Sequence, residues 1–103
     1  MKNNMVTDES EIYLKQLSKA LASTKDEALI LDFFHSILTP SEISEVALRW
    51  ALVMKIHDGK SQRAIAKELR LSLCKITRGS KELKKKDSSF KKMIEKWKEL
   101  SGR

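Results

Sequence analysis

The side chains that could do catalytic or metal chemistry are few in this sequence, and they lie far apart. His35 and His57 have no cysteine or second histidine at the spacing that a zinc site needs. Cys74 lacks the paired histidine motif of a thiol nucleophile, and the acidic residues at positions 8–11 sit where a helix start favours negative charge. The sequence also has no glycine-rich phosphate loop. We therefore expect no catalytic residues, no metal site and no enzyme.

A binding function is indicated instead by residues 61–83, which have the spacing of a DNA-reading helix-turn-helix. Ser61 and Ser72 stand where each of two short helices needs an N-cap, and Ala66 is small where the helices must cross. Glycine usually occupies the turn position after Leu69, because the backbone is left-handed there. Here it is Arg70, at a cost of about 1 kcal/mol if that conformation is kept.

Several side chains of this motif are left facing outward, where they can meet DNA. In the general docking scheme the second helix enters the major groove and the first lies across the backbone. Leu73 and Cys74 are then candidates for contacts with thymine methyl groups, and Thr77 for a base or a phosphate. Candidates for contacts with phosphates are Gln62, Arg63 and Lys75, and Lys67 is a further outward residue expected to bind DNA. The alternative is that Leu73 belongs to the core and the polar residues are only solvated.

The elements that position this motif are predicted to be helices throughout. Helical periodicity and capping residues predict one helix at 8–22 and a second, apolar on nearly every side, after Ser23 or Thr24. A third helix begins at Pro40 behind Thr39 and ends at Asp58-Gly59. The two short helices at 61–83 follow. A sixth helix with an apolar stripe between positions 90 and 100 is capped by Asp87 or Ser88.

The fold class expected is all-α, with residues 1–103 as a single helical domain. Its parts are a dimerisation core at 8–58, the helix-turn-helix at 61–83 and a C-terminal helix at 88–101 that completes the core. The apolar stripes of the second, third and sixth helices exceed what one thin bundle can cover. We therefore expect a homodimer.

Charge is distributed unevenly along the chain, whose formal net charge is +7. Residues 1–59 carry a net −3 and residues 60–103 a net +10. A segregated basic region of this kind suits binding to a phosphate backbone, although a solvated lysine-rich surface is the alternative. Cys74 is the only cysteine, so no internal disulfide is possible, and no stretch is apolar enough to span a membrane. We expect a cytoplasmic protein.

Three landmarks between positions 37 and 83 resemble the bacterial Trp repressor family. They are Leu38-Thr39-Pro40, Gly59-Lys60-Ser61-Gln62-Arg63 and Ile76-Thr77-Arg78-Gly79-Ser80, of which the last is the most specific. The resemblance covers about half the chain. It implies an intertwined six-helix homodimer with helix-turn-helix reading heads, acting as a transcription repressor on duplex operator DNA with L-tryptophan as corepressor.

The resemblance also implies which residues hold the corepressor. The indole would lie between Arg49 and Arg78, since a guanidinium plane stacks on an aromatic face and pairs with a carboxylate. Thr39 would help Arg78 with the carboxylate, the carbonyl near Leu38 would receive the ammonium, and Gly79 would leave room for the ring. Solvated or phosphate-contacting roles for the two arginines are the alternative.

This sequence departs from the family pattern at positions that bear on the ligand. Glu82 replaces the serine expected beside the ligand ammonium, Ala66 replaces a lysine, and the loop at Gly59-Lys60 is one residue shorter. Two alternatives therefore stay open. One is a regulator of the same fold that responds to no ligand or to another small molecule, and the other is a helical adaptor that docks a partner helix on residues 90–100.

Overall fold

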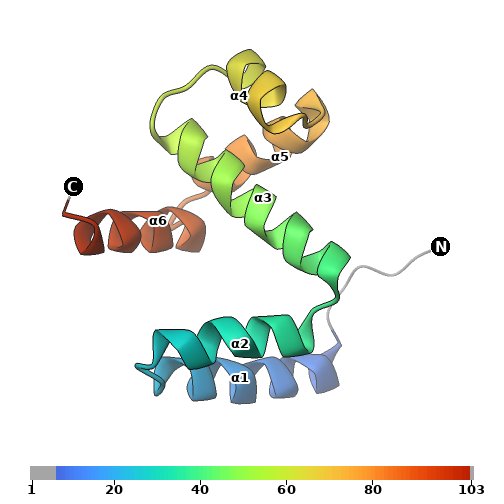
Figure 1. Ribbon diagram of the computed structural model, residues 1–103, viewed down its shortest axis with the longest axis vertical. Helices are drawn as coiled ribbons and strands as arrows, with labels where there is room; N and C mark the ends of the chain where they lie inside the picture. The colour runs from blue at the N-terminus through green and yellow to red at the C-terminus, as the bar shows by residue number, and fades with distance from the viewer. Residues whose placement is uncertain (1–6, 103) are drawn as a thin grey trace. The chain divides into compact units, whose positions relative to one another are not determined.

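The computed structural model describes residues 7–102, and over these residues the chain forms six α-helices and no strand (Figure 1). The expected all-α class is therefore confirmed for that part of the chain. The helices fall into two compact units, Met1–Pro40 and Ser41–Arg103.

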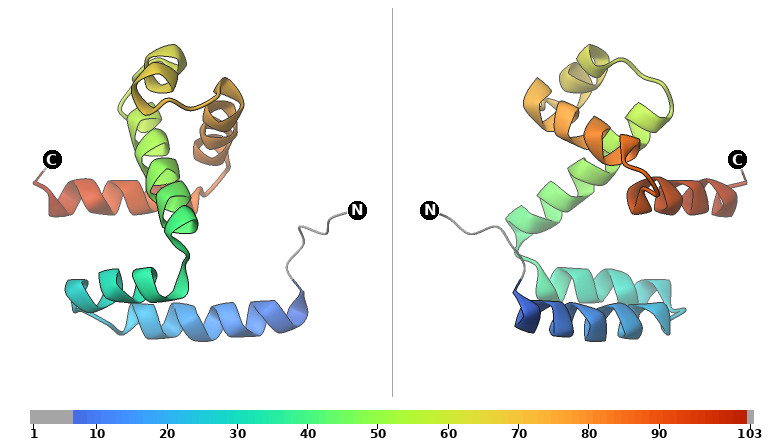
Figure 2. Two further views of the ribbon diagram at one scale, coloured as in Figure 1. Left: turned by 45° about the vertical axis from the view of Figure 1, so that its right-hand side comes forward. Right: turned by 180° about the vertical axis from the view of Figure 1, so that it is seen from behind.

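The first unit is a hairpin of two helices, α1 (Asp8–Ala22) and α2 (Glu27–Ile37), which run antiparallel (Figures 1 and 2). Thr7 caps α1 by accepting a hydrogen bond from the backbone N–H of Ser10. The three acidic residues of the first turn of α1 complement the helix dipole, as the sequence predicts.

The cap predicted for the second helix is wrong. Asp26 caps α2, and its side chain accepts from the backbone N–H of Leu29. The hydroxyls of Ser23 and Thr24 instead donate backward to the carbonyl of Ala20, at 2.9 and 2.8 Å. Both residues thus satisfy an unpaired carbonyl at the end of α1, which is the usual competing role of a hydroxyl side chain near a helix terminus.

The hairpin buries little of its apolar surface. Neither α1 nor α2 has a buried residue, and the side chains of Leu29, Leu31 and Phe34 are exposed, with Leu31 at 58%. Two helices alone offer no third surface against which such side chains can pack. The first unit therefore presents an apolar surface that its own residues leave open.

The second unit contains α3 (Pro40–His57), α4 (Gln62–Leu69), α5 (Leu73–Lys84) and α6 (Ser89–Leu100), of which only the first residue of α3 lies outside it. The predicted start of α3 at Pro40 and its end before Asp58-Gly59 are confirmed, and Gly59 has a φ of +90°. Ser88 caps α6 through the N–H of Lys91, as one of the two predicted caps. The other, Asp87, has a φ of +55° in the turn between α5 and α6.

One small core joins the four helices of this unit. Its buried side chains are Leu52 and Val53 of α3, Ile65 of α4, Ile76 of α5 and Ile94 of α6. The ring of Phe90 on α6 stacks on Trp50 of α3, with centroids 5.8 Å apart and planes 16° apart. Each helix is therefore fixed to the others through a single shared cluster rather than through its sequence neighbour alone.

Candidate nucleic-acid interface and adjoining pocket

The helix-turn-helix is built by α4, a short turn and α5. Ser61 and Ser72 cap the two helices by accepting from the backbone N–H of Ala64 and Lys75, so both predicted caps are confirmed. Arg70 adopts the left-handed conformation, with φ 56° and ψ 44°, at the turn position where motifs of this kind usually have glycine. The turn is closed by the N–H of Leu71, which donates to the carbonyl of Ala66 at 3.1 Å.

The predicted DNA-contacting side chains are all exposed on these two helices. Leu73 is 50% exposed, which excludes it from the core. On α4 and α5 the other exposed members of the set are Gln62, Arg63, Lys67, Cys74, Lys75 and Thr77. Leu73 and Cys74 begin α5, so they lie at the end of the helix that the docking scheme directs into the groove.

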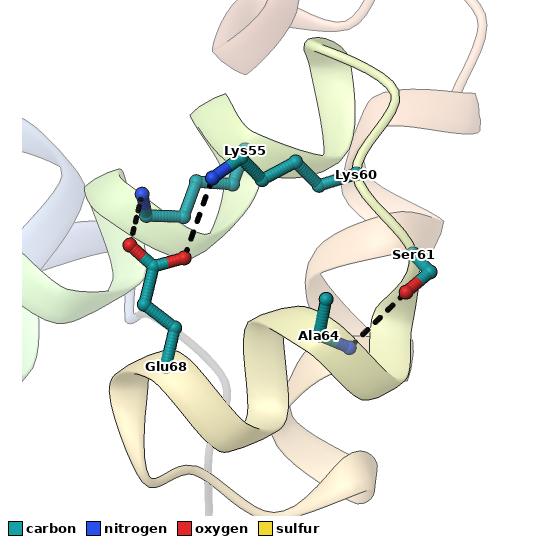
Figure 3. Close-up of polar contacts among 5 residues, drawn as sticks. All are labelled: Lys55, Lys60, Ser61, Ala64 and Glu68. Atoms are coloured by element: carbon teal, nitrogen blue, oxygen red, sulfur yellow. Dashed lines mark hydrogen bonds and ion pairs between the residues drawn. The ribbon is translucent and has the colours of Figure 1, made fainter.

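A charge cluster that the sequence did not predict adds to the packing of α4 through Ile65. Figure 3 shows Glu68 of α4 between two lysines, accepting from Nζ of Lys55 on α3 at 2.9 Å and from Nζ of Lys60 at 3.4 Å. The hydrogen bond from Lys55 is the largest cause that holds the pKa of Glu68 below its usual value. No local spacing rule relates position 55 to position 68, so only the fold brings these charges together.

A second ion pair fixes α6 against the end of α3. Nζ of Lys98 donates to Asp58, and this hydrogen bond lowers the pKa of the Asp58 carboxyl more than any other contact. His57 lies beside it, with Nδ1 4.0 Å from the same carboxylate. The C-terminal end of α3 is thus bound by charge to α4 on one side and to α6 on the other.

A pocket of about 500 Å³ lies beside α5, on the side where α5 faces α3 and α6. Its apolar lining comes from α3, from α6 and from the turn before α5: Leu48, Leu52, Val53, Leu71 and Phe90. Its charged lining consists of Glu45 and Arg49 on α3 and of Lys75, Arg78 and Glu82 on α5. A ligand here would therefore directly contact α5, the second helix of the helix-turn-helix, called the recognition helix below.

Four of the six predicted corepressor residues meet in this pocket: Arg49, Arg78, Gly79 and Glu82. The other two, Leu38 and Thr39, belong to the first unit, where Leu38 is the C-cap of α2. Phe90 was not predicted as a pocket residue, because a core stripe and a pocket wall look alike in sequence.

Gly79 has a packing role in addition to the space it leaves at the pocket. A Cβ at this position would lie 2.6 Å from Cδ1 of Leu52 and 3.1 Å from Cγ2 of Val53. A Cβ here would therefore displace the ends of two side chains that belong both to the core and to the pocket wall. The glycine allows the close approach of α5 to α3 without that rearrangement.

Over residues 7–102 the structure contains no cluster of three or more potential metal ligands. The same part of the chain has no helix long and apolar enough to cross a lipid bilayer.

Comparison with known proteins places these observations in a family. The family model described as Trp repressor protein matches residues 13–98. A Trp operon repressor homolog of Chlamydia trachomatis serovar D is 37% identical over 71 residues, which cover 68% of this chain and 76% of the relative. The homolog from serovar L2 is 35% identical over the same length. No solved structure matches. The chain belongs to the Trp repressor family of helix-turn-helix DNA-binding transcription repressors, which are not enzymes.

Proposed function

We propose that this chain represses transcription as a homodimer that binds operator DNA and uses L-tryptophan as its corepressor. The observation that carries the proposal is the pocket in which Arg49 of α3 and Arg78 of α5 line the same apolar cavity beside the recognition helix. The name of the chlamydial relatives, Trp operon repressor homolog, supports the same regulatory role.

The DNA contact is proposed for the exposed start of α5 and the outer face of α4. Leu73, Cys74 and Thr77 would meet the edges of bases in the major groove, as the docking scheme of such motifs requires. Gln62, Arg63, Lys67 and Lys75 would meet phosphates. The net +10 of residues 60–103 would make binding strongly dependent on salt.

A second copy of the chain is proposed as the partner of the exposed apolar surfaces. These surfaces lie on α1 and α2 in the first unit and on α6 in the second, where Met93, Trp97 and Leu100 are exposed and Leu100 reaches 79%. Apolar surface of this extent on a small chain favours obligate association. The residues at 8–58 and 88–101 would form the dimer core.

The pocket suits an aromatic amino acid for two physical reasons. Its aliphatic and aromatic walls can bury an indole ring, and a guanidinium can stack on that ring or pair with the carboxylate. Leu38 and Thr39 would complete the site as the family resemblance implies. A ligand held between α3 and α5 would favour one arrangement of the reading head, so that ligand and DNA would strengthen each other's binding.

The test is operator binding with and without ligand. Duplex DNA selected by the protein from a random library should bind roughly tenfold more tightly in the presence of saturating L-tryptophan. Arg78→Ala should weaken both the heat of tryptophan binding in calorimetry and the affinity for DNA. Arg63→Ala is the matched control, because it should weaken DNA binding and leave the tryptophan heat unchanged.

A regulator of the same family that needs no ligand is the second candidate. It is favoured by the contacts that hold α4 and α5 on α3 without a ligand, namely the packing of Ile65 and Ile76 on the core and the close approach of Gly79 to Leu52. Equal affinity for the selected DNA with and without millimolar tryptophan, together with no binding heat, would support it and refute the corepressor.

A further inference from the structure

Lys60 is a cationic residue at the start of the helix-turn-helix to which the proposed DNA contacts assign no role. It directly precedes Ser61, the cap of α4, and the proposed phosphate contacts Gln62 and Arg63 follow within three residues. The Lys60 side chain is 50% exposed. A lysine has a flexible four-carbon chain, so its ammonium can reach a phosphate beside the one that a neighbouring residue contacts. By its place in the chain, Lys60 is therefore suited to bind the DNA backbone.

In this structure the Lys60 ammonium is held by an acidic side chain instead. Its Nζ lies 3.4 Å from Oε1 of Glu68. Figure 3 shows the Lys60 side chain running toward Lys55 and Glu68, away from Ser61. Glu68 lies six residues after Gln62, which is about 9 Å further along the axis of α4. The ammonium is thus directed away from the first turn of α4.

Of the two lysines on Glu68, Lys60 is the one that can leave. Lys55 is closer, at 2.9 Å, and its side chain is only 24% exposed. The hydrogen bond from Lys55 is the largest cause that lowers the pKa of Glu68, and both contributions from Lys60 are smaller. The backbone N–H of Lys60 donates to the carbonyl of Lys55 at 3.1 Å, so only the side chain has to move. Glu68 would remain paired with Lys55 after that movement.

From this arrangement we infer that Lys60 is a further contact to the DNA backbone, and that Glu68 competes with DNA for it. On binding, the Lys60 ammonium exchanges the Glu68 carboxylate for a phosphate, and Glu68 stays on Lys55. An exposed ion pair contributes little to stability, whereas duplex DNA presents about one negative charge for every 1.7 Å of its axis. The inference rests on the proposed function, because it assumes that phosphates lie beside the first turn of α4.

Titration of the selected duplex with the full chain, followed by fluorescence anisotropy over a series of salt concentrations, tests the inference. Lys60→Gln should weaken binding and reduce the slope of log affinity against log salt concentration by about one for each reading head. Glu68→Gln should tighten binding roughly two- to fivefold for each reading head, because Lys60 then has no carboxylate to leave. In the Lys60→Gln background, Glu68→Gln should give no such gain.

Two further variants make the result specific. Lys60→Arg keeps the charge and should keep the salt slope of wild type. Lys15→Gln removes a lysine from an exposed position on α1 and should also leave the slope unchanged. Circular dichroism of each variant, compared with wild type, verifies the fold. If Glu68 only stabilised α4, its replacement would weaken DNA binding in both backgrounds.

The outcomes separate this inference from the proposed function. If Glu68→Gln weakens binding with an unchanged dichroism spectrum, or tightens it equally in the Lys60→Gln background, the competition is refuted. If Arg63→Ala reduces the salt slope and Lys60→Gln does not, the Lys60 contact is refuted and the proposed DNA face of α4 stands. If neither variant changes the slope, the proposed face is refuted as well.

Discussion

Arg70 occupies a backbone conformation that few residues other than glycine adopt readily, and it does so in the turn between α4 and α5. A left-handed residue with a Cβ costs roughly 1–2 kcal/mol, and glycine avoids this cost while losing more entropy on folding. We therefore predict that Arg70→Gly raises the free energy of unfolding by about 1 kcal/mol. Urea denaturation at one fixed protein concentration measures the change, since dimerisation would make stability depend on concentration.

Arg70→Lys is the control for this prediction. Lysine keeps both the charge and the strained conformation, so its stability should equal that of wild type. Arg70→Val should be less stable than either, because a branched Cβ fits the left-handed region worst. A glycine variant no more stable than the lysine variant would show that the turn conformation costs nothing at this position.

How well single residues could be predicted from sequence depended on the range of their contacts. The predictions of Ser61 and Ser72 as caps were correct because a cap contacts backbone only three residues ahead. The predicted cap of α2 was wrong because the hydroxyls of Ser23 and Thr24 bind an equally near group, the carbonyl of Ala20 in the preceding helix. The partners of Glu68 could not be predicted, since a lysine thirteen residues away is brought near only by packing.

At the scale of the helices, the ion pair of Asp58 and Lys98 adds to the packing of α6 against α3. The hydrogen bond from Lys98 lowers the pKa of Asp58 from its usual 3.8, so the folded state binds this proton less readily than the unfolded state. The pair therefore contributes stability above the unfolded pKa, and that contribution disappears as the pH falls through the lower, folded pKa.

Asp58→Asn should remove this contribution. The difference in unfolding free energy between wild type and Asp58→Asn should be constant above about pH 5 and shrink below about pH 4. Chemical denaturation over a pH series measures it. In a Lys98→Met background the same substitution should show little pH dependence, because the main cause of the shift is then absent. An unchanged pH dependence in that background would refute the pairing.

The sequence indicated the helices far better than their arrangement. The starts of α1, α3, α4 and α5 agree with the predicted positions because each has a local signal. The pocket could be only partly predicted: the resemblance supplied Arg49, Arg78, Gly79 and Glu82, whereas the wall formed by Phe90 depends on how α6 packs against Trp50. Long-range packing of this kind produces no regular residue spacing from which it could be predicted.

For the molecule as a whole, the open apolar surface of the α1–α2 hairpin is the feature that most needs explanation. Two helices without a single buried side chain cannot offset the entropy of ordering them. The proposed second copy would supply the missing surface. The chain should therefore sediment at twice its 11.8 kDa mass, and its thermal midpoint should rise with protein concentration.

Leu31→Glu tests this directly, because it places a charge in the middle of the exposed apolar surface of α2. We expect the variant to shift toward monomer in sedimentation velocity and to lose helical signal, since the hairpin would lack its cover. Ser36→Glu adds the same charge at an exposed polar position of the same helix and should leave the dimer intact. If wild type and Leu31→Glu are both monomeric and equally helical at tens of micromolar, the hairpin is stable by itself. Its apolar face must then be explained by something other than a second copy.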